Sequence, residues 1–554
     1  MADCLESELF VDEKRLNEVL EKARAFALTK GICMQSEQRG QDGTMLAQHF
    51  PFTLFPSVVP RTCFQEAVDC MLDFNTLIHK VAHDHNFLEK ALKNVLKVDE
   101  FTKGLWQIYT QVREEGYTQP LSLGLFRNDF MIDVQDPDHV QIKQVEINTI
   151  AAGAGSLGSL LVHLHSVLEV DEFTQGLWKI YTQVREEGYT QPLSLGLFRN
   201  DFMIDVQDPD HVQIKQVEIN TIAAGAGSLG SLLVYLHRFT LDLIGKHYDN
   251  REVQDNNSSL GAALGLLKAW ELYGRKQAAI LFVVRETESN IFDQRLLEFK
   301  VLSINSRVRV IRGTYMDIYN GASLTEDKRL LVDGDEVAVV YLRAGYAPDD
   351  VPTHKEWDAR LKLERSLAIK CPSIQYHLAG LKKIQQELSL PGSVEQFMKD
   401  PAAVKRIRAT FVKQYSLDVG PEGDKGVELG KTDPDMYVLK PQREGGGNNL
   451  YGDDIREFLE THQNSTERNA YILMERIFPK TQKNYLVTPG RPFVLSDVTS
   501  ELGIFGVFLG SATEEKINMQ CGHMLRTKLL GTDDSGLRTG HACLDTPFLV
   551  NEEL

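Results

Sequence analysis

The segment KPQREGGGNN, residues 440–449, holds the residues best suited to chemistry, and it directly follows a β-rich run at 437–440. Three consecutive glycines let backbone N–H groups approach a phosphate closely and form an anion-binding nest. Lys440 and Arg443 add positive charge, and Glu444 offers an oxygen ligand where Mg²⁺ would sit. A flexible turn is the alternative, but the flanking Lys, Glu and Asn residues favour a phosphate site. It is not a Walker A loop, because G-x-x-x-x-G-K-[ST] is absent.

A second candidate site is the pair Glu218 and Asn220, which recurs as Glu146 and Asn148. On a strand, residues i and i+2 share a face, so the carboxylate and the amide are expected to point into one pocket. Together with Glu444 they would supply oxygen ligands for one or two Mg²⁺ ions that bridge phosphate oxygens. The alternative is a surface strand face with solvated polar side chains.

The turn after this strand matches G-x-G-x-x-G at residues 225–230, between a strand and a helix. A dinucleotide fold also needs an acidic residue about 20 positions further on, at the end of a second strand. That region reads as a helix instead, and Glu218 would repel a pyrophosphate in the absence of a metal. The glycines are therefore expected to allow a small substrate to approach the backbone.

Other charged residues are weaker candidates. Arg199, repeated as Arg127, lies mid-strand among apolar residues and suits either a carboxylate clamp or a salt bridge. Asn290 precedes a helix, either as its N-cap or beside an anionic substrate group at the helix N-terminus. Arg526 and Lys528 place two cations near the C-terminal end.

A long repeat interrupts the chain. Residues 95–165 recur as 167–237 at an offset of 72 residues, and each unit reads as helix, strand, turn, strand and helix. Solenoids need about three or more units, so we expect a tandem duplication inserted into a single-copy fold, which leaves 554 − 72 = 482 residues as the functional chain. Four of the 71 aligned positions differ: Lys97/Glu169, Lys103/Gln175, Gln107/Lys179 and His163/Tyr235.

Composition narrows the class of protein. The formal charge of −18 disfavours binding to nucleic acid and to anionic membranes. The sequence has no run of 18 apolar residues, so we expect no membrane helix. The acidic N-terminus also lacks the apolar core of a signal peptide. Seven cysteines without a C-x-x-C pair indicate reduced thiols in the cytosol. Cys521 and His523 are not expected to form a nucleophile–base pair, because no third residue orients them.

In the middle of the chain, apolar segments typical of strands alternate with segments typical of helices. Strands are expected at 278–284, 307–312 and 336–343, and they predict an open, mostly buried α/β sheet that ends near Gly380. Further strands are expected at 437–440, 470–477 and 501–510. The N-terminal part is predicted to be helical at 12–30, which ends at Gly31, and at 64–96. The polar, Gly-rich segment 420–435 is interpreted as a surface loop.

Five motifs resemble the eukaryotic glutathione synthetase family: KPQREGGGNNLYG (440–452), QVEINT (216–221), NIFDQR (290–295), AWELYG (269–274) and SELGIFGV (500–507). The resemblance covers nearly the whole chain once one repeat unit is set aside. It implies an α/β (α+β) protein, with an ATP-grasp catalytic fold and an inserted open α/β substrate-binding domain. The implied divisions are an N-terminal helical part (1–94), copy one as the extra segment (95–166), copy two with following helices (167–276), the substrate-binding domain (277–380) and the C-terminal ATP-grasp part (381–554).

The resemblance also implies roles for individual residues. The magnesium ligands would be Glu218, Asn220 and Glu444, with Glu146, Asn148 and the accompanying Arg127 as copy-one alternatives. The ATP-binding positions would be Glu218, Lys382, Lys440, Glu444, Gly445, Gly446, Gly447, Asn448, Asn449, Tyr451, Met474, Glu475, Arg476, Ile477, Glu501, Lys528 and Asp534. The peptide-substrate contacts would be Arg199, Ile222, Ala223, Ala224, Gly225, Glu288, Ser289, Asn290, Gln294, Arg343, Ala344, Gly345, Tyr346, Arg526, Leu537 and Arg538, of which Arg526 and Arg199 are the catalytic candidates.

Some positions depart from the family pattern. Ala344 stands where the family usually carries Asp, Ala223 and Ala224 lie in a turn that usually contains Ser, and Arg538 replaces a small residue in a second Gly-rich segment. These changes concern recognition of the dipeptide and the acceptor. The metal and phosphate positions are unchanged.

The implied reaction is ATP- and Mg²⁺-dependent ligation of γ-glutamylcysteine to glycine through an acyl phosphate, in a cytoplasmic homodimer that binds neither nucleic acid nor membranes. Two alternatives stay open. One is the same ligase with another acceptor, such as β-alanine or serine. The other is a nucleotide-binding protein made inactive by the duplication. Both copies keep Arg, Glu and Asn, but copy two runs into the continuation that resembles the family, so we expect it to fill the site and copy one to be an appendage.

Overall fold

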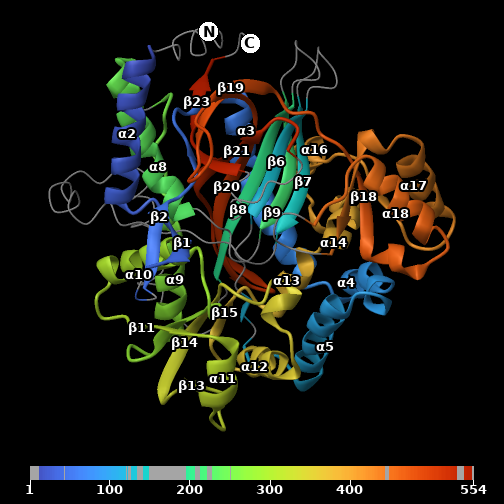
Figure 1. Cartoon of the computed structure of the whole chain (residues 1–554). Coiled ribbons are helices and arrows are strands. Elements are labelled where there is room, and N and C mark those ends of the chain that lie inside the picture. The colour runs from blue at the N-terminus through green and yellow to red at the C-terminus, as the bar shows by residue number, and fades with distance from the viewer. Residues whose placement is uncertain are drawn as a thin grey trace.

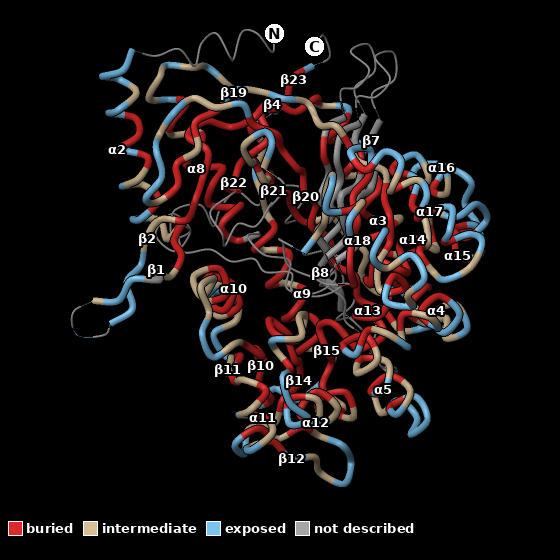
Figure 2. The backbone as a smooth tube through the Cα atoms, turned by 45° about the vertical axis from the view of Figure 1, so that its right-hand side comes forward, coloured by how far each residue is buried: buried red, intermediate tan, exposed pale blue. Residues whose placement is uncertain are grey.

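A computed structural model describes residues 12–40, 42, 44–119, 121–122, 127–133, 141–148, 195–205, 213–220, 227–249, 251–442, 448–532 and 542–551. Helices surround one large sheet of 16 strands, and a smaller three-stranded sheet forms a separate lobe (Figure 1). This mixed helix-and-sheet architecture confirms the α/β class predicted from the sequence. Figure 2 shows that the backbone is most continuously buried along the central strands and the helices beside them.

The centre of the large sheet is strand β20 (Leu495–Ser511), which pairs along most of its length with β21 (Glu514–Leu529). Its other edge is shared in succession by β19 (Thr481–Val487), by β6 of the repeat and by β5 (Leu121–Ser122). From β19 the pairing continues through β3 (Phe52–Thr53) and β22 (Ala542–Asp545) back to β21. These strands therefore form a closed ring of pairing.

The predicted α/β sheet in the middle of the chain is confirmed. Its strands β10 (Ala279–Val283), β11 (Val310–Gly313), β14 (Asp335–Leu342) and β15 (Ile369–Cys371) are parallel and mostly buried. Ser122 of β5 pairs with both β15 and β20, so this sheet continues the large one. The accompanying elements are α9 (Ser258–Tyr273), α10 (Ile291–Ile304), α11 (Tyr315–Gly321), β12 (Ala322–Leu324), β13 (Leu330–Val332), α12 (His354–Glu364) and α13 (Ile374–Ala379).

Helices from the two ends of the repeat region and from the N-terminal part cover the large sheet. The helix predicted at 12–30 is α2 (Glu13–Lys30), and Gly31 ends it in the left-handed conformation with φ of 80°. The region 64–96 forms α3 (Arg61–Ala82), α4 (His85–Leu92) and a short 3₁₀ turn at Val95–Lys97. The remaining N-terminal strands are β1 (Cys33–Arg39), β2 (Met45–His49) and β4 (Ser57–Pro60), which pairs with β23 (Pro547–Val550).

The separate lobe is the antiparallel sheet β16 (Gln414–Ser416), β18 (Tyr471–Glu475) and β17 (Tyr437–Pro441). Helices α17 (Pro421–Thr432) and α18 (Asp453–His462) pack against it, seen at the right of Figure 1. Three shorter helices, α14 (Lys382–Ser389), α15 (Ser393–Phe397) and α16 (Pro401–Thr410), connect the lobe with the α/β sheet. The lobe has its own core of Leu417, Val427, Tyr437, Leu439, Ile455, Leu459 and Leu473.

The interpretation of residues 420–435 as a surface loop was wrong, because helix α17 occupies most of this segment. Pro421 stands in the first turn, where a missing N–H costs nothing. The buried Gly423, Gly426 and Gly430 are required by close packing rather than by flexibility. A Cβ atom at Gly423 would lie 1.8 Å from the carbonyl oxygen of Asp418, and one at Gly430 would lie 2.5 Å from Leu459 Cδ1.

The repeat is placed differently from the expectation that copy one is an appendage. Helix α5 (Glu100–Glu115) belongs to copy one, and its apolar face is buried in the main core against α12 and α13. Helix α8 (Gly227–Ile244) begins in copy two and is also buried. Between them lie two equivalent hairpins, β6 (Arg127–Asp133) with β7 (Gln141–Asn148), and β8 (Leu195–Asp205) with β9 (Gln213–Asn220). The structure therefore draws on both copies.

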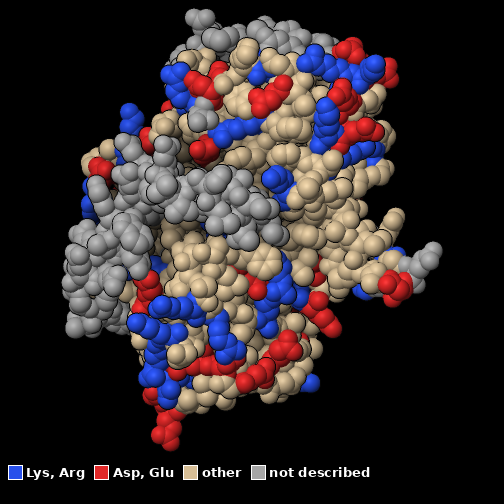
Figure 3. Space-filling model, turned by 90° about the vertical axis from the view of Figure 1, so that its left-hand side faces the viewer, with Lys and Arg blue, Asp and Glu red and all other residues tan. Residues whose placement is uncertain are grey.

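Surface and cysteine features agree with the composition. Acidic and basic side chains are interspersed over the face shown in Figure 3. In the described part of the chain, no helix combines the length and the apolar character needed to span a membrane. The six described cysteines are buried free thiols.

Helix α17 yields a test of its packing. We expect Gly430→Val to destabilise the lobe by about 1–3 kcal/mol, because the added atoms meet Leu459 and Leu473 in a filled core. Thermal unfolding followed by circular dichroism measures the effect. Lys425→Val is the control, since it puts the same side chain on the exposed face of the same helix and should change stability by less than about 0.5 kcal/mol. Equal effects of the two substitutions would contradict this account of the glycines.

Candidate functional site

One face of the large sheet collects several predicted site residues. Glu501 of β20 lies directly opposite Arg526 of β21, and the buried carboxylate forms an ion pair with the mostly buried guanidinium. Lys528 is two residues beyond Arg526, so it projects from the same face. Next to them, Ser500 Oγ lies 2.7 Å from Thr527 Oγ1, which donates to Asp545 Oδ2 at 2.6 Å. These bonds belong to the opposite face and hold the two strands in register.

Strand pairing places the repeat residues on the face of Glu501. Gly503 of β20 pairs with Asp129 of β6, which pairs with Glu146 of β7. Two residues further along, Phe505 pairs with Arg127 and Arg127 pairs with Asn148. Directly paired residues share a face. Glu501, Gly503 and Phe505 are every second residue of β20, so they also share one face. The Arg, Glu and Asn positions of copy one therefore lie on the same face as Glu501 and Arg526.

The hairpin of copy two has the same internal register. Asp201 pairs with Glu218, and Arg199 pairs with Asn220. Met203, on the same face of β8 as Arg199, packs with Val412, Met474 and Ile477. Since Met474 and Ile477 are predicted ATP-binding positions at the end of β18, this contact joins the hairpin to the smaller lobe.

The lobe contributes two buried lysines, Lys440 in β17 and Lys382 at the start of α14, which are 1% and 2% exposed. Gln442 connects their two elements. Its side-chain oxygen accepts the backbone N–H of Lys383 at 3.0 Å, and its own backbone N–H donates to the carbonyl of Ala470 at 3.2 Å. The distance between the two elements that carry the lysines is thereby fixed.

The Gly-rich segment 440–449 is closed at its base. Leu439 and Leu450 exchange backbone hydrogen bonds of 3.1 and 3.0 Å, so the two ends of the segment are held side by side. Just beyond it, the guanidinium of Arg476 lies over the ring of Tyr451 at 5.8 Å from the centroid. Glu475 accepts a hydrogen bond from the Tyr415 hydroxyl at 3.2 Å. Asn448 is exposed and Asn449 is half-buried.

The predicted peptide-substrate residues meet at the ends of β10, β14 and α10. Asn290 Nδ2 lies 3.5 Å from Asp293 Oδ2, and Arg343 Nη2 lies 3.6 Å from the same oxygen. Asn290 occupies the N-cap position of α10, but its side chain does not cap the helix. Its backbone N–H instead donates to Glu288 Oε1 at 3.1 Å. Ser289 is tied to β1, because its carbonyl accepts the Gln35 N–H at 2.9 Å.

Three of these residues carry buried polar atoms without a hydrogen-bond partner among the described residues: Asn290 Oδ1, Gln294 Nε2 and Arg343 Nε. Leaving a buried polar atom unpaired costs about 1–3 kcal/mol. An amide oxygen, an amide N–H and a guanidinium N–H together suit a ligand that has both donors and an anionic group, such as an amino acid or a peptide.

The turn after β14 is organised by Asp350. Its Oδ2 atom accepts the backbone N–H groups of Gly345 at 2.9 Å and Tyr346 at 3.1 Å, and its Oδ1 atom pairs with Arg285 at 2.5 Å. Arg285 in turn lies over the Tyr346 ring at 4.5 Å. Ala344, where the family usually carries Asp, is buried, and its carbonyl accepts the Tyr315 hydroxyl at 3.4 Å. The turn thus keeps its shape without an acidic side chain at 344.

Other predicted positions lie outside the described residues. They are Ile222, Ala223, Ala224 and Gly225, Arg443, Glu444, Gly445, Gly446 and Gly447, and Asp534, Leu537 and Arg538. The side chains of Arg199, Glu218 and Asn220, and those of Arg127, Glu146 and Asn148, are likewise not described, although their backbones are. Within the described part of the chain, no group of three or more His, Cys, Asp and Glu residues could hold a metal ion.

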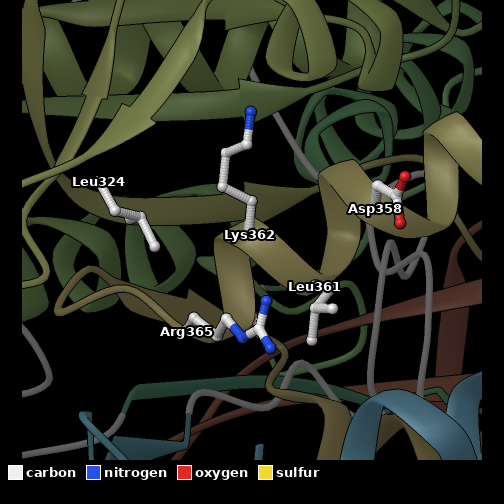
Figure 4. Close-up of a pocket in the computed structure, with 5 residues that line it drawn as sticks. All are labelled: Leu324, Asp358, Leu361, Lys362 and Arg365. Carbon is white, nitrogen blue, oxygen red and sulfur yellow. The ribbon is translucent and has the colours of Figure 1, made fainter. Parts of the chain in front are cut away.

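Two features of the described chain are not functional sites. A surface pocket next to α12 is lined by Leu324, Asp358, Leu361, Lys362 and Arg365 (Figure 4). Its Lys362 already donates to the carbonyl of Ala322 at 2.7 Å, and its Arg365 pairs with Glu115. Burial lowers the pKa of His523 to about 3 and raises the pKa of the Cys521 thiol, which agrees with the prediction that they are not a nucleophile–base pair.

The comparisons with known proteins decide the family. The family model described as "Eukaryotic glutathione synthase, ATP binding domain" matches residues 13–169 and 160–549. The chain belongs to the eukaryotic glutathione synthetase family. It is 39% identical to glutathione synthetase of Mus musculus over 540 residues, covering 97% of this chain and 98% of the relative. Identity to the Homo sapiens enzyme is also 39%, over 543 residues and 98% of both chains.

More distant members agree. The chloroplastic glutathione synthetase of Arabidopsis thaliana is 32% identical over 545 residues, which cover 98% of this chain and 86% of the relative. Among solved structures, a glutathione synthetase-like effector from Globodera pallida in its apo form matches with a TM-score of 0.66 and 23% identity, covering 98% of both chains. The similarity to this solved structure shows the fold alone.

The structure adds residues that the sequence reasoning missed. Asp293, Arg312 and Asp350 support the predicted substrate positions, and Gln442 joins the two lysines. Arg312 donates to Gln294 Oε1 at 2.6 Å, and burial, with the neighbouring Arg295, lowers the pKa of Arg312 to about 10. Asp293 and Gln442 stand inside the quoted motifs NIFDQR and KPQREGGGNNLYG, whereas Arg312 and Asp350 carry no local signal.

Gln442 yields a test of how the site is positioned. We expect Gln442→Ala to weaken ATP binding, because the N–H of Lys383 loses its acceptor and α14 is no longer held against β17. Leaving the buried N–H of Lys383 without an acceptor costs about 1–3 kcal/mol, so the dissociation constant should rise about fivefold or more, as measured by isothermal titration calorimetry. Gln463→Ala is the control, since Gln463 is exposed and accepts from the side chain of Lys431. ATP affinity that is unchanged in Gln442→Ala would remove Gln442 from the positioning of the lysines.

Proposed function

We propose that the chain is an ATP-dependent carboxylate–amine ligase that joins γ-glutamylcysteine to glycine and forms glutathione, ADP and phosphate. The observation that carries the proposal is that anion-binding and peptide-binding features border the same strands. The ion pair of Glu501 and Arg526 shares a sheet face with the Arg, Glu and Asn positions of the repeat. The 39% identity to glutathione synthetases over nearly the whole chain supports the same substrates.

The nucleotide belongs between the smaller lobe and the large sheet, which is the arrangement of an ATP-grasp fold. The lobe offers the buried Lys440 and Lys382 for phosphate oxygens and the apolar Met474 and Ile477 for the base. Gly445, Gly446 and Gly447, with Asn448 and Asn449, would close over the phosphates from the loop whose base is held at Leu439 and Leu450. Further contacts are assigned to Tyr451, Glu475, Arg476, Glu501, Lys528 and Asp534.

Magnesium fits the donor set assigned to it. Glu218, Asn220 and Glu444 supply two carboxylates and one amide oxygen, the hard ligands that Mg²⁺ prefers. Glu218 and Asn220 are two residues apart in β9, so these two positions share one face of the strand. When bound, the ion neutralises charge on the phosphate oxygens during phosphoryl transfer.

The dipeptide belongs at the orphaned polar atoms of Asn290, Gln294 and Arg343. Arg343 is buried beside Asp293 and supplies a guanidinium N–H for an anionic group. Glu288, Ser289, Ala344, Gly345 and Tyr346 shape the same pocket, and Arg199, Ile222, Ala223, Ala224, Gly225, Leu537 and Arg538 complete the assigned contacts. The departures at Ala344 and Arg538 make the acceptor amine the open part of the specificity.

In the reaction, an oxygen of the cysteinyl carboxylate attacks the γ-phosphorus of ATP, and the bond to the β–γ bridging oxygen breaks, which releases ADP. The amine of glycine then attacks the acyl carbon, loses a proton, and expels phosphate. Arg526 stabilises the negative charge that develops at the acyl centre, held in position by Glu501. Arg199 orients the carboxylate, and the protein acts by positioning and electrostatics.

The repeat is consistent with a duplication inside this single-copy fold. The family model matches the chain in two segments, 13–169 and 160–549, which overlap within the repeat. The functional length is then 482 residues, and the substrate-binding part (277–380) and ATP-grasp part (381–554) follow the repeat. We also propose that the protein works in the cytoplasm as a homodimer.

The surface that supports a dimer is the hairpin of β1 and β2, a separate two-stranded sheet. Met45 and Leu46 at its outer end are 56% and 43% exposed. A strand edge with exposed apolar side chains can pair with another chain, which supports this hairpin as the interface.

Activity is tested by ADP release. We expect release to require γ-glutamylcysteine and glycine together, with glutathione formed in equal amount, and a panel containing β-alanine and serine defines the acceptor. Glu444→Gln should reduce the rate at least about a hundredfold, because a metal ligand next to the phosphates is lost. Glu428→Gln, on the exposed face of α17, is the control. ADP release without glycine, or a normal rate in Glu444→Gln, would contradict the assignment.

Dimerisation is tested by Met45→Asp. A charge on the outer end of the hairpin should convert the dimer to a monomer in size-exclusion chromatography with light scattering, because burying it without a partner is costly. Val494→Asp, at an equally exposed apolar position away from the hairpin, should leave the dimer intact. A wild-type monomer, or a dimer that survives Met45→Asp, would exclude this interface.

A further inference from the structure

The two hairpins of the repeat compete for one place in the sheet. Along the edge that faces away from β21, β20 pairs with β19 at residues 495–499 and with β5 at 510–511, which leaves residues 500–509 for a strand of the repeat, and 502–505 of these are paired. Strand β6 forms the ladder there, and the equivalent strand β8 also contacts β20. One edge of a strand forms a hydrogen-bonded ladder with one neighbouring strand at a time, so β6 and β8 cannot both pair with this stretch.

The pairings inside the repeat show that equivalent strands substitute for one another. Met131 of β6 pairs with Lys143 of β7, and it also pairs with Lys215 of β9, the equivalent of Lys143. Conversely, Lys143 pairs with Met203, the equivalent of Met131. Because β20 takes one edge of β6, β7 and β9 compete for the other. Figure 1 shows the four strands gathered beside β20.

Sequence differences give neither copy an advantage. Residues 108–162 are identical to residues 180–234, so both hairpins make the same contacts in the same position. At the four differing positions, the described residues Lys97, Gln107 and Tyr235 are exposed, and the Lys103 side chain is 44% exposed. The core therefore does not distinguish the copies.

The excluded segment is equally long in every arrangement. Helix α5 of copy one and helix α8 of copy two are both packed in the core, so the surplus lies between them. Whether the sheet takes β6 with β7, β8 with β9, or β6 with β9, 72 residues are left over. The entropy cost of closing a loop depends on its length, so these arrangements have similar free energies and similar populations.

We propose that the hairpin strands exchange at this place on β20, so that the site receives Arg127 from β6 or Arg199 from β8, and receives Glu146 and Asn148 from β7 or Glu218 and Asn220 from β9. The roles of these residues rest on the proposed function. The exchange itself rests only on the strand pairing and the identity of the copies. The chain thus carries two equivalent sets of metal-site residues for one nucleotide.

Hydrogen exchange tests the exchange of hairpins without reference to activity. Peptides from the two hairpins have the same mass, so a substitution must distinguish them. Ile132→Val makes the peptides of copy one lighter by a single methylene group, and Ile204→Val, the matched control, does the same for copy two. We expect both hairpins to be partly protected, with fractions that add up to about one. Full protection of one hairpin with none of the other, the same in both variants, would overturn the proposal, and so would simultaneous full protection of both.

Deletion of residues 95–166 supplies the single-copy reference. In that background we expect the remaining hairpin to be fully protected, as β20 is, and Glu218→Gln alone to abolish ligase activity. Partial protection there would mean that the hairpin frays without competition, which would also overturn the proposal.

Substitutions in the full chain then assign the roles. Glu146→Gln and Glu218→Gln are each expected to leave an intermediate rate, with the two residual rates adding up to about the wild-type rate, and the double variant should be inactive. Loss of all activity in one single variant, with none lost in the other, would overturn sharing. If hydrogen exchange shows two partly protected hairpins but the double variant stays active, the proposed metal role fails and the exchange stands.

Discussion

The backbone pairing of β20 is the constraint on which the rest of the structure depends. One edge is taken by β21, and the other is divided among β19, a strand of the repeat and β5. Because each partner belongs to a different part of the chain, β20 sets the position of β19, the hairpin of the repeat and the α/β sheet relative to one another. Glu501 and Arg526 form their ion pair within this ladder. The backbone hydrogen bonds of β20 and β21 therefore fix the position of Arg526, the residue proposed to act at the acyl centre.

Charge is distributed to suit an anionic ligand. The chain as a whole carries a formal charge of −18, yet Lys382, Lys383 and Lys440 are almost completely buried close to the nucleotide strands. Lys383 is balanced by Asp418 at 3.0 Å and by hydroxyl and amide oxygens. Cations gathered at one place of an acidic protein suit the anionic ligand of the proposed function.

The sequence predicted what depends on local pattern. Alternating apolar strands located β10, β11 and β14, the strand before KPQREGGGNN is β17, and the family was recognised from short motifs. The interpretation of residues 420–435 as a loop was wrong because the glycines there permit close packing against Asp418 and Leu459 and do not provide local flexibility. Arg312 and Asp350 were missed for a similar reason, since their partners Gln294 and Arg285 are distant in sequence. The placement of the repeat was not predictable, because identical segments carry no signal that chooses between them.

The two-residue strand β5 has a mechanical consequence. Ser122 pairs with β15 on one side and with β20 on the other, which makes the α/β sheet and the central ring one continuous sheet. A rigid rotation between those halves would break this seam. The lobe of β16, β17 and β18 is a separate sheet, joined to the rest by helices and side-chain packing. Any closing motion around ATP therefore requires the lobe to move, while the large sheet keeps its shape.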